Sequence, residues 1–136
     1  MRQIFINLAV ENAEKSMDFY AQLGFTNNPE FTDDEQKCMV WSEQIYVMLI
    51  SNKRFNIYNK INVTAAKGNL TATYTLPVES LDKVNEIIES GLRVGGNEPI
   101  PMIDEGFMQI RNIEDPDGHL WGIIFLDMDK FRKTKQ

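Results

Sequence analysis

The chain has 136 residues, of which 43% are hydrophobic and 25% are charged, and its net charge is −6. This length and hydrophobic content predict one ordinary globular domain with a substantial core. The acidic balance argues against nucleic acid as a partner, because phosphates attract clustered lysine and arginine. The cationic cluster at residues 130–136 is expected to be a solvated, frayed tail. No apolar run approaches the roughly 20 residues of a membrane span, so no membrane partner is expected.

Two features predict a cytoplasmic protein. The single cysteine, Cys38, cannot form an internal disulfide and suits a reducing compartment. The opening residues, MRQIFINLAVEN, contain no apolar stretch typical of a signal peptide. Cys38 has no histidine or other base near it in the sequence, so we expect a buried, small hydrophobic residue there and no nucleophile.

The first half of the chain predicts a strand, a helix and two more strands. Residues 3–10 are rich in branched and aromatic side chains, as in a β-strand. Residues 11–25 predict a helix, with Asn12 as its N-cap and Gly24 just after its end. A polar loop then leads to two further predicted strands, which are residues 36–42 and 45–51.

The second half repeats this pattern. A shift of 68 residues places Val10 on Val78, and Ser80 then caps a second predicted helix that Gly91 closes. Two strands complete this half, residues 106–115 and 119–127. The Asp-Pro-Asp-Gly sequence between them suits a tight turn, because proline fixes one dihedral angle and glycine accepts a positive φ.

The fold class that this repeat predicts is α+β. Two tandem βαβββ modules would form one curved, mostly antiparallel sheet, with helices on its outer face and a central groove between the halves. The expected organisation is a single domain with module one at about 1–52 and module two at about 69–127. Between them lies a linker of about 53–68 with a possible short helix at 55–60, and the basic tail is 128–136.

Several stretches resemble one known family. FINLAVENAEKSMDFYAQLGF and DPDGHLWGIIF resemble the opening and closing segments of the vicinal oxygen chelate superfamily, which includes glyoxalases, bleomycin-resistance proteins and extradiol dioxygenases. CMVWSEQIYVMLIS and EGFMQIRNIEDPDGHLW are similar to a bacterial subgroup described as predicted lactoylglutathione lyases. The resemblance covers nearly the whole chain, and it implies a small-molecule ligand, a homodimer, and lyase, isomerase or dioxygenase activity.

The resemblance also implies where a metal ion would bind. Metal-using members hold one divalent ion with four inward side chains, usually histidine and glutamate, and the matching positions here are Phe5, Met48, Thr73 and Gly122. Phenylalanine and glycine offer no ligand atom, and thioether and hydroxyl groups are poor donors for Zn²⁺, Ni²⁺ or Fe²⁺. No metal cofactor is therefore expected.

The only histidine, His119, is expected to be a structural residue of a turn. It lies three positions before Gly122, so strand alternation turns it to the opposite face of the sheet. The Asp-x-Asp-Gly spacing before it lacks the other ligands of a calcium loop. A site made only of carboxylates, using Asp104, Glu105 or Glu114, stays open as an alternative.

Strand alternation predicts which residues line the groove. The predicted lining is Phe5, Asn7, Tyr46, Met48, Thr73, Thr75 and Gly122, together with Phe107, Gln109 and Arg111 or their neighbours on the same strand. This lining suits an uncharged or weakly polar organic molecule, and Arg111 could bind a carboxylate or phosphate. Alternatively, Phe5, Met48 and Leu120 could simply fill the groove as core residues.

Three functions are compatible with these residues. The favoured one is a binding protein of the bleomycin-resistance kind that holds a small organic molecule without a metal ion. A glyoxalase-type enzyme would need a Lewis acid and a carboxylate base, and Met48 and Gly122 supply neither. Metal-free catalysis by Tyr46, Asn7 or Arg111 is the third, and whether the protein is an enzyme stays open.

Overall fold

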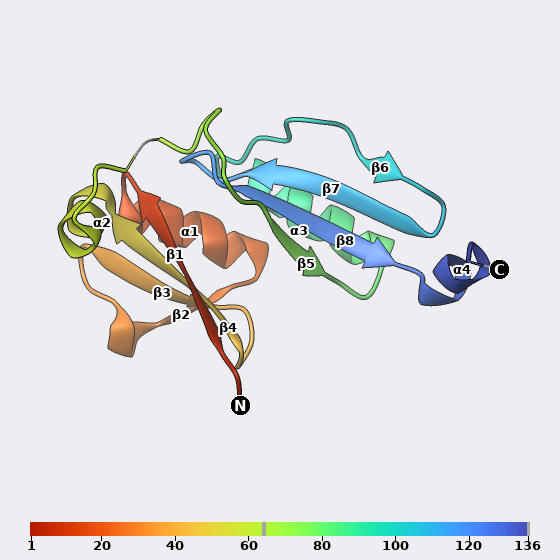
Figure 1. Ribbon diagram of the computed structural model, residues 1–136, viewed down its shortest axis with the longest axis horizontal. Helices are drawn as coiled ribbons and strands as arrows, with labels where there is room; N and C mark the ends of the chain where they lie inside the picture. Colours follow the sequence, from red (N-terminus) through yellow and green to blue (C-terminus); the bar gives the residue numbers. More distant parts are fainter. Residues whose placement is uncertain (64, 136) are drawn as a thin grey trace. The chain divides into compact units, whose positions relative to one another are not determined.

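The computed structural model describes residues 1–63 and 65–135, and it divides the chain into two compact units (Figure 1). Unit one is Met1–Asn69 and unit two is Leu70–Gln136. The division lies at the end of the segment that the sequence marks as a linker. Among the described residues, no helix has the length and apolar character that crossing a membrane requires.

Unit one contains a four-stranded sheet, which we call sheet A. Its strands run in the order β1-β4-β3-β2, with β1 parallel to β4 and the other neighbours antiparallel. In chain order the elements are β1 (Ile4–Val10), α1 (Ala13–Leu23), β2 (Thr26–Asn28), the 3₁₀ helix η1 (Pro29–Phe31), β3 (Gln36–Val40), β4 (Ile45–Ser51) and α2 (Asn52–Asn59).

Unit two contains a second four-stranded sheet, sheet B, with the same topology. Its order is β5-β8-β7-β6, with β5 parallel to β8 and the other neighbours antiparallel. In chain order the elements are β5 (Tyr74–Pro77), α3 (Leu81–Leu92), β6 (Ile103–Asp104), β7 (Met108–Glu114), β8 (Leu120–Leu126) and α4 (Met128–Lys133).

The shared topology confirms the α+β fold and the strand-helix-strand-strand-strand repeat. The two halves also agree residue by residue, because Asn7 lies opposite Met48 in sheet A and Thr75 lies opposite Gly122 in sheet B. One detail differs, since hydrogen bonds define two separate sheets where one continuous sheet was expected. The groove between the halves stays a prediction.

Two segments expected to be mostly irregular form helices. The linker carries α2, which begins at Asn52 and so includes most of the short helix predicted there. The basic tail, expected to be frayed, forms α4, and the ring of Phe131 in that helix packs 5.2 Å from the ring of Phe107. This aromatic contact and the Asp127 N-cap hold the first turn of α4 in place.

Local capping explains where the two main helices begin. The Asn12 side chain accepts a hydrogen bond from the backbone N–H of Lys15, and the Ser80 side chain accepts one from Lys83. Gly24 ends α1 with a φ of 114°, a left-handed conformation that favours glycine. Gly91 does not play that part in α3, because it is buried inside the last turn.

Helices α1 and α3 each cover one face of their own sheet, and Figure 1 shows α3 lying along β7 and β8. In unit one Phe19, Tyr20 and Leu23 of α1 are buried on this side together with Val47 and Leu49 of β4. In unit two the buried core of this kind consists of Leu76, Val84, Ile87, Ile88, Ile113, Trp121 and Ile123. The side chains of the other parity form what we call the open face of each sheet.

Lys37 is an unusual member of the helix-covered face of sheet A. Its side chain is only 4% exposed, and its ammonium lies 2.9 Å from the carboxylate of Glu14 on α1. Burying an ammonium group is unfavourable unless it is paired, so Glu14 offsets part of that cost and links helix to sheet.

Candidate functional site

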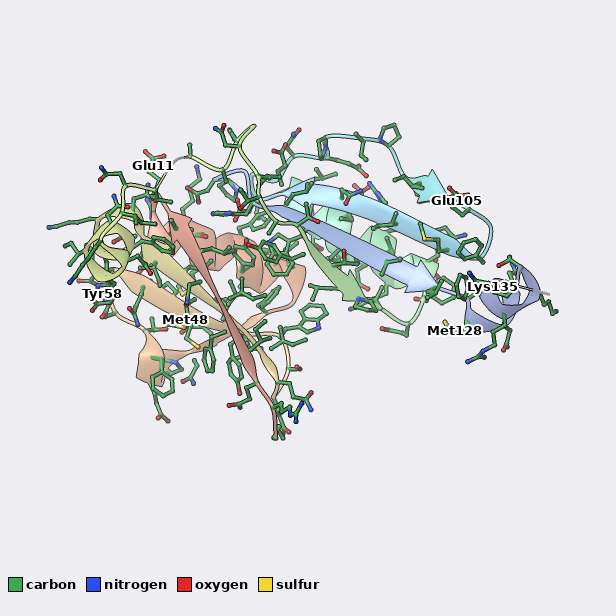
Figure 2. All side chains as sticks on the ribbon, in the orientation of Figure 1. Glu11, Met48, Tyr58, Glu105, Met128 and Lys135 are labelled. Atoms are coloured by element: carbon green, nitrogen blue, oxygen red, sulfur yellow. The ribbon has the colours of Figure 1, made fainter. Side chains whose placement is uncertain are left out.

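A cavity of about 290 Å³ opens on the open face of sheet A. It brings together Phe5 and Asn7 from β1 with Met48 from β4, which is labelled in Figure 2. These three residues were predicted to share a face, and the register places Asn7 directly opposite Met48. Two residues outside the predicted set, Phe31 and Gln36, complete the lining.

The loop that carries Phe31 is held to β3 by Thr32. The Thr32 hydroxyl donates to the backbone carbonyl of Asn28 at 2.8 Å and accepts from the side-chain amide of Asn27 at 2.8 Å. The same oxygen accepts from the backbone N–H of Cys38 at 3.1 Å. These bonds fix η1 to the sheet. The Phe31 ring therefore forms one wall of the cavity in a defined position, although 58% of it is exposed.

The side-chain amide of Gln36 is oriented by an ion pair beside the cavity. Arg54 lies 2.8 Å from Asp33 and also donates to the side-chain oxygen of Gln36 at 3.2 Å. The hydrogen bond from Arg54 is the main reason that the pKa of Asp33 lies below its usual value, so this carboxylate stays ionised. With its oxygen engaged, Gln36 keeps its NH₂ group for other acceptors.

The cavity itself is uncharged. Its five lining residues are two phenylalanines, a methionine and two amides. Asn7 is exposed, and its amide makes no hydrogen bond to any other residue in the part of the chain that the structure describes. The cavity therefore offers aromatic and thioether surface with hydrogen-bonding groups from Asn7 and Gln36, a combination that fits a neutral organic ligand.

Tyr46 supports this cavity and has its hydroxyl engaged elsewhere. Its ring stacks on Phe5 with centroids 4.5 Å apart and an interplanar angle of 11°. The hydroxyl donates to the backbone carbonyl of Glu43 at 3.0 Å and accepts from Gln3 at 3.2 Å. Tyr46 thus orients the ring of Phe5, and its phenol is occupied by the turn before β4.

The open face of sheet B brings Thr75 and Gly122 together, as predicted. A Cβ atom added to Gly122 would lie 3.4 Å from the Thr75 hydroxyl oxygen and 3.2 Å from the side-chain oxygen of Asn112. It would lie 2.9 Å from Cδ1 of Ile110, which is closer than real Cβ contacts allow. Thr73 precedes β5 and is exposed.

The prediction that Phe107, Gln109 and Arg111 share this face is wrong, and their neighbours take the place. Asn112 lies opposite Gly122 and Ile110 opposite Ile124, so the odd-numbered residues of β7 turn toward α3.

The side chains of Phe107, Gln109 and Arg111 all have partners away from the open face of sheet B. The guanidinium of Arg111 lies 2.8 Å from Glu98 and 2.9 Å from Glu89. Gln109 donates to Asp104, and the ring of Phe107 packs on the tail helix.

Replacing Glu98 with glutamine should make unit two less sensitive to acid. Hydrogen bonds from Arg111 lower the pKa of Glu98 below its ordinary value of 4.5. A carboxylate with a lowered folded-state pKa stabilises the protein above that ordinary value, and this contribution is lost as the pH falls through the folded pKa.

The measurement is the melting temperature of both proteins at pH about 7 and pH about 3. The wild type should lose more on acidification than Glu98→Gln does. Glu105→Gln removes an exposed carboxylate of the same unit, labelled in Figure 2, and should behave like the wild type. An equal loss in wild type and Glu98→Gln would contradict this assignment.

The Asp-Pro-Asp-Gly turn forms as predicted. The side chain of Asp115 accepts hydrogen bonds from the backbone N–H groups of Asp117 and His119, each at 2.9 Å. Gly118 closes the turn with a φ of 94°. His119 takes part in the turn through its backbone, which agrees with a structural role.

Cys38 is also where the sequence places it. It is fully buried, and burial raises the pKa of its thiol. Such a thiol stays protonated and is a poor nucleophile.

The residues at the four matched metal positions do not fit a divalent ion. Phe5 presents a stacked ring, Gly122 has no side chain, and Met48 and Thr73 offer a thioether and a hydroxyl. Within residues 1–63 and 65–135, no three His, Cys, Asp or Glu side chains come close enough together to hold a metal ion.

The three site residues that sequence reasoning missed differ in how visible they were. Alternation along β3 puts Gln36 on the same face as Cys38 and Met48, so the pattern contained that signal. Asn112 belongs to the neighbour set that was left open on β7. Phe31 sits in a polar loop, and its only signal was an isolated aromatic residue there.

The fold is that of proteins described as glyoxalase/bleomycin resistance/dioxygenase proteins. The chain is similar to such an enzyme from Burkholderia phytofirmans, with a TM-score of 0.79, 10% identity, and coverage of 93% of this chain and 99% of that one. For a glyoxalase-related enzyme from Fulvimarina pelagi the values are 0.78, 21%, 92% and 88%.

A third similar structure is a hypothetical protein from S. aureus, with a TM-score of 0.78, 24% identity, and coverage of 92% of this chain and 94% of that one. At these identities the likeness concerns the fold. No family model matches the sequence, and no curated protein matches it significantly. The lactoylglutathione lyase subgroup stays a prediction.

Proposed function

We propose that the protein binds a small, neutral, largely aromatic molecule in the cavity on the open face of sheet A, and that it does so without a divalent metal ion. The observation that carries this proposal is the uncharged lining of Phe5, Asn7, Phe31, Gln36 and Met48. Aromatic walls favour a flat apolar body, and the Gln36 NH₂ group and the Asn7 amide favour a hydrogen-bond acceptor on it.

Both charge and donor chemistry support this ligand class. Arg54, the cation next to the cavity, is already paired with Asp33, so it adds little attraction for an anionic ligand. The matched metal positions lack nitrogen and carboxylate ligands, so they offer no side chains that would hold the metal ion used as a Lewis acid in a glyoxalase-type reaction. The homodimer and the cytoplasmic location remain predictions.

Coumarin, a planar neutral lactone, should bind saturably in this cavity. In protein with ¹³C-labelled methionine methyl groups, the Met48 signal should shift, while that of Met39, buried on the helix-covered face, should not. Phe5→Ala should weaken binding about tenfold, because it removes one aromatic wall. Prior dialysis against EDTA should change nothing.

The control is a second cavity of unit one, about 220 Å³, whose lining of Glu35, Lys53, Arg54, Ile57 and Tyr58 includes three charged residues (Tyr58 is labelled in Figure 2). Ile57→Ala alters that cavity and should leave coumarin affinity unchanged. A Met48 signal that does not shift with coumarin would contradict binding in this cavity. Binding that disappears after dialysis against EDTA would contradict only the proposal that no divalent metal ion is needed.

A further inference from the structure

We propose that the second cavity of unit one, of about 220 Å³, binds an α-amino acid in its zwitterionic form, with an apolar or aromatic side chain. The cavity is lined by four residues of α2, which are Lys53, Arg54, Ile57 and Tyr58, and by Glu35 directly before β3. This cavity and its ligand class both differ from those of the site on the open face of sheet A, so the two can be tested separately.

One face of α2 forms a wall of this cavity. Lys53 and Ile57 are four residues apart, as are Arg54 and Tyr58, so their side chains are neighbours on one face of the helix. None of the eight residues of α2 is buried, and Ile57 and Tyr58 are 62% and 67% exposed. This face therefore places apolar surface beside two cations, and the fold leaves that surface in contact with water.

Hydrogen bonds hold the Glu35 carboxylate in position across from this face. Its Oε2 accepts from the hydroxyl of Ser51, the N-cap of α2, and that hydroxyl accepts from the backbone N–H of Arg54 at 3.2 Å. The Ser51 backbone N–H also donates to the Glu35 carbonyl at 2.8 Å. Among residues 1–63 and 65–135 the other carboxylate oxygen, Oε1, has no donor, so it can accept from a ligand.

The guanidinium of Arg54 is also fixed, and part of it is unused. Its Nη1 donates to both carboxylate oxygens of Asp33, at 2.9 and 2.8 Å, and to the side-chain oxygen of Gln36. In the part of the chain that the structure describes, Nε and Nη2 donate to no acceptor. These two groups form a fork that matches a carboxylate. Because Asp33 offsets the charge of Arg54, the fork orients a ligand carboxylate more than it attracts one.

The charges around the cavity decide the ligand class. With Arg54 and Asp33 paired, Lys53 and Glu35 are the remaining charges, and within the described residues they form no ion pair with each other. A ligand that carries only a carboxylate is repelled by Glu35, and one that carries only an ammonium is repelled by Lys53. A zwitterion satisfies both, with its ammonium on Glu35 and its carboxylate on Lys53 and the Arg54 fork. The exposed apolar side chains of α2 then pack against the side chain of the amino acid.

L-Phenylalanine is the probe, and ¹⁵N-labelled full-length protein is the sample. Saturable shifts are expected at the backbone amides of Glu35 and Lys53. Two analogues keep the phenyl ring and lose one charge each, since hydrocinnamate lacks the ammonium and phenethylamine lacks the carboxylate. Each should bind at least about tenfold more weakly than L-phenylalanine. Equal affinity for either analogue would overturn the assignment of a zwitterion.

Two variants that each remove one charge test the residues by their effect on each ligand. Glu35→Gln keeps an acceptor for Ser51 and should raise the Kd of L-phenylalanine about tenfold, while it strengthens hydrocinnamate binding by removing a repulsion. Lys53→Met should weaken L-phenylalanine and hydrocinnamate alike and strengthen phenethylamine. Damage to the fold would weaken all three ligands, so that pattern in both variants would refute the assigned roles.

Lys15→Met is the matched control, since Lys15 is an exposed lysine of α1 that does not line the cavity. It should bind L-phenylalanine as the wild type does. Shifts at Met48 with none at Glu35 and Lys53 would place L-phenylalanine in the first cavity, and the absence of any saturable shift would mean that it does not bind. Either result would overturn the second site, and neither depends on whether coumarin binds.

Discussion

Replacing Arg111 with methionine is expected to lower the free energy of unfolding of unit two by about 2 to 3 kcal/mol. The Arg111 side chain is 12% exposed and pairs with Glu98, which is 20% exposed, and with Glu89, which is 53% exposed. It also donates to the side-chain oxygen of Asn85 at 3.0 Å. Methionine keeps much of the volume but leaves these acceptors without their donor, so the loss is mainly electrostatic.

This value is smaller than the roughly 3 to 5 kcal/mol lost when a fully buried ion pair is broken. It is smaller because water reaches Glu89 and can hydrate its carboxylate once the arginine is gone. Arg111→Lys should recover only part of the loss, since an ammonium cannot bond three acceptors with the geometry of a planar guanidinium. Arg93→Ala is the control, because Arg93 is exposed and, among residues 1–63 and 65–135, its side chain donates only to Ser90.

Urea unfolding monitored by circular dichroism gives the free energies. The control should change stability by less than about 0.5 kcal/mol. If Arg111→Met proved as stable as Arg93→Ala, the three acceptors would be adequately hydrated without the arginine, and the ion-pair cluster would contribute nothing measurable.

The repeat could be predicted because its signals are local. Asn12 and Ser80 cap helices within three residues of themselves, and Gly24 marks a helix end through its own backbone conformation. The expectation of one continuous sheet went further than such signals reach. Which strands share hydrogen bonds is decided by contacts between distant segments, and these join each half within itself.

The candidate site was predictable only where alternation had a fixed starting point. Phe5, Asn7 and Met48 share a face because β1 and β4 pair in register, and they line one cavity as expected. On β7 both parities mix polar and apolar residues, so the sequence left two choices. The structure selects the face of Asn112, since Arg111 has its partners on α3 and in the segment between α3 and β6.

Gly122→Glu places the family's usual type of metal ligand at its matched position, and we expect it to lower the free energy of unfolding by about 2 kcal/mol. Gly122 is buried, and even a Cβ atom there would meet Ile110 at 2.9 Å. A carboxylate forced into this buried position, against Ile110 and the side-chain oxygen of Asn112, should have a raised pKa, so its charged form is the unfavourable one. The destabilisation should therefore be largest at neutral pH and smaller below the ordinary glutamate pKa of about 4.3.

Gly122→Gln separates the two contributions, because it has nearly the same shape and no charge. Its destabilisation should be smaller and independent of pH between about 4 and 7. Neither variant should show a saturable rise in melting temperature with Ni²⁺, Zn²⁺ or Mn²⁺, since the other matched positions remain a ring, a thioether and a hydroxyl. A saturable rise in Gly122→Glu alone would mean that one substitution separates this chain from a metal site, and the metal-free proposal would then rest on residue 122 and not on all four positions.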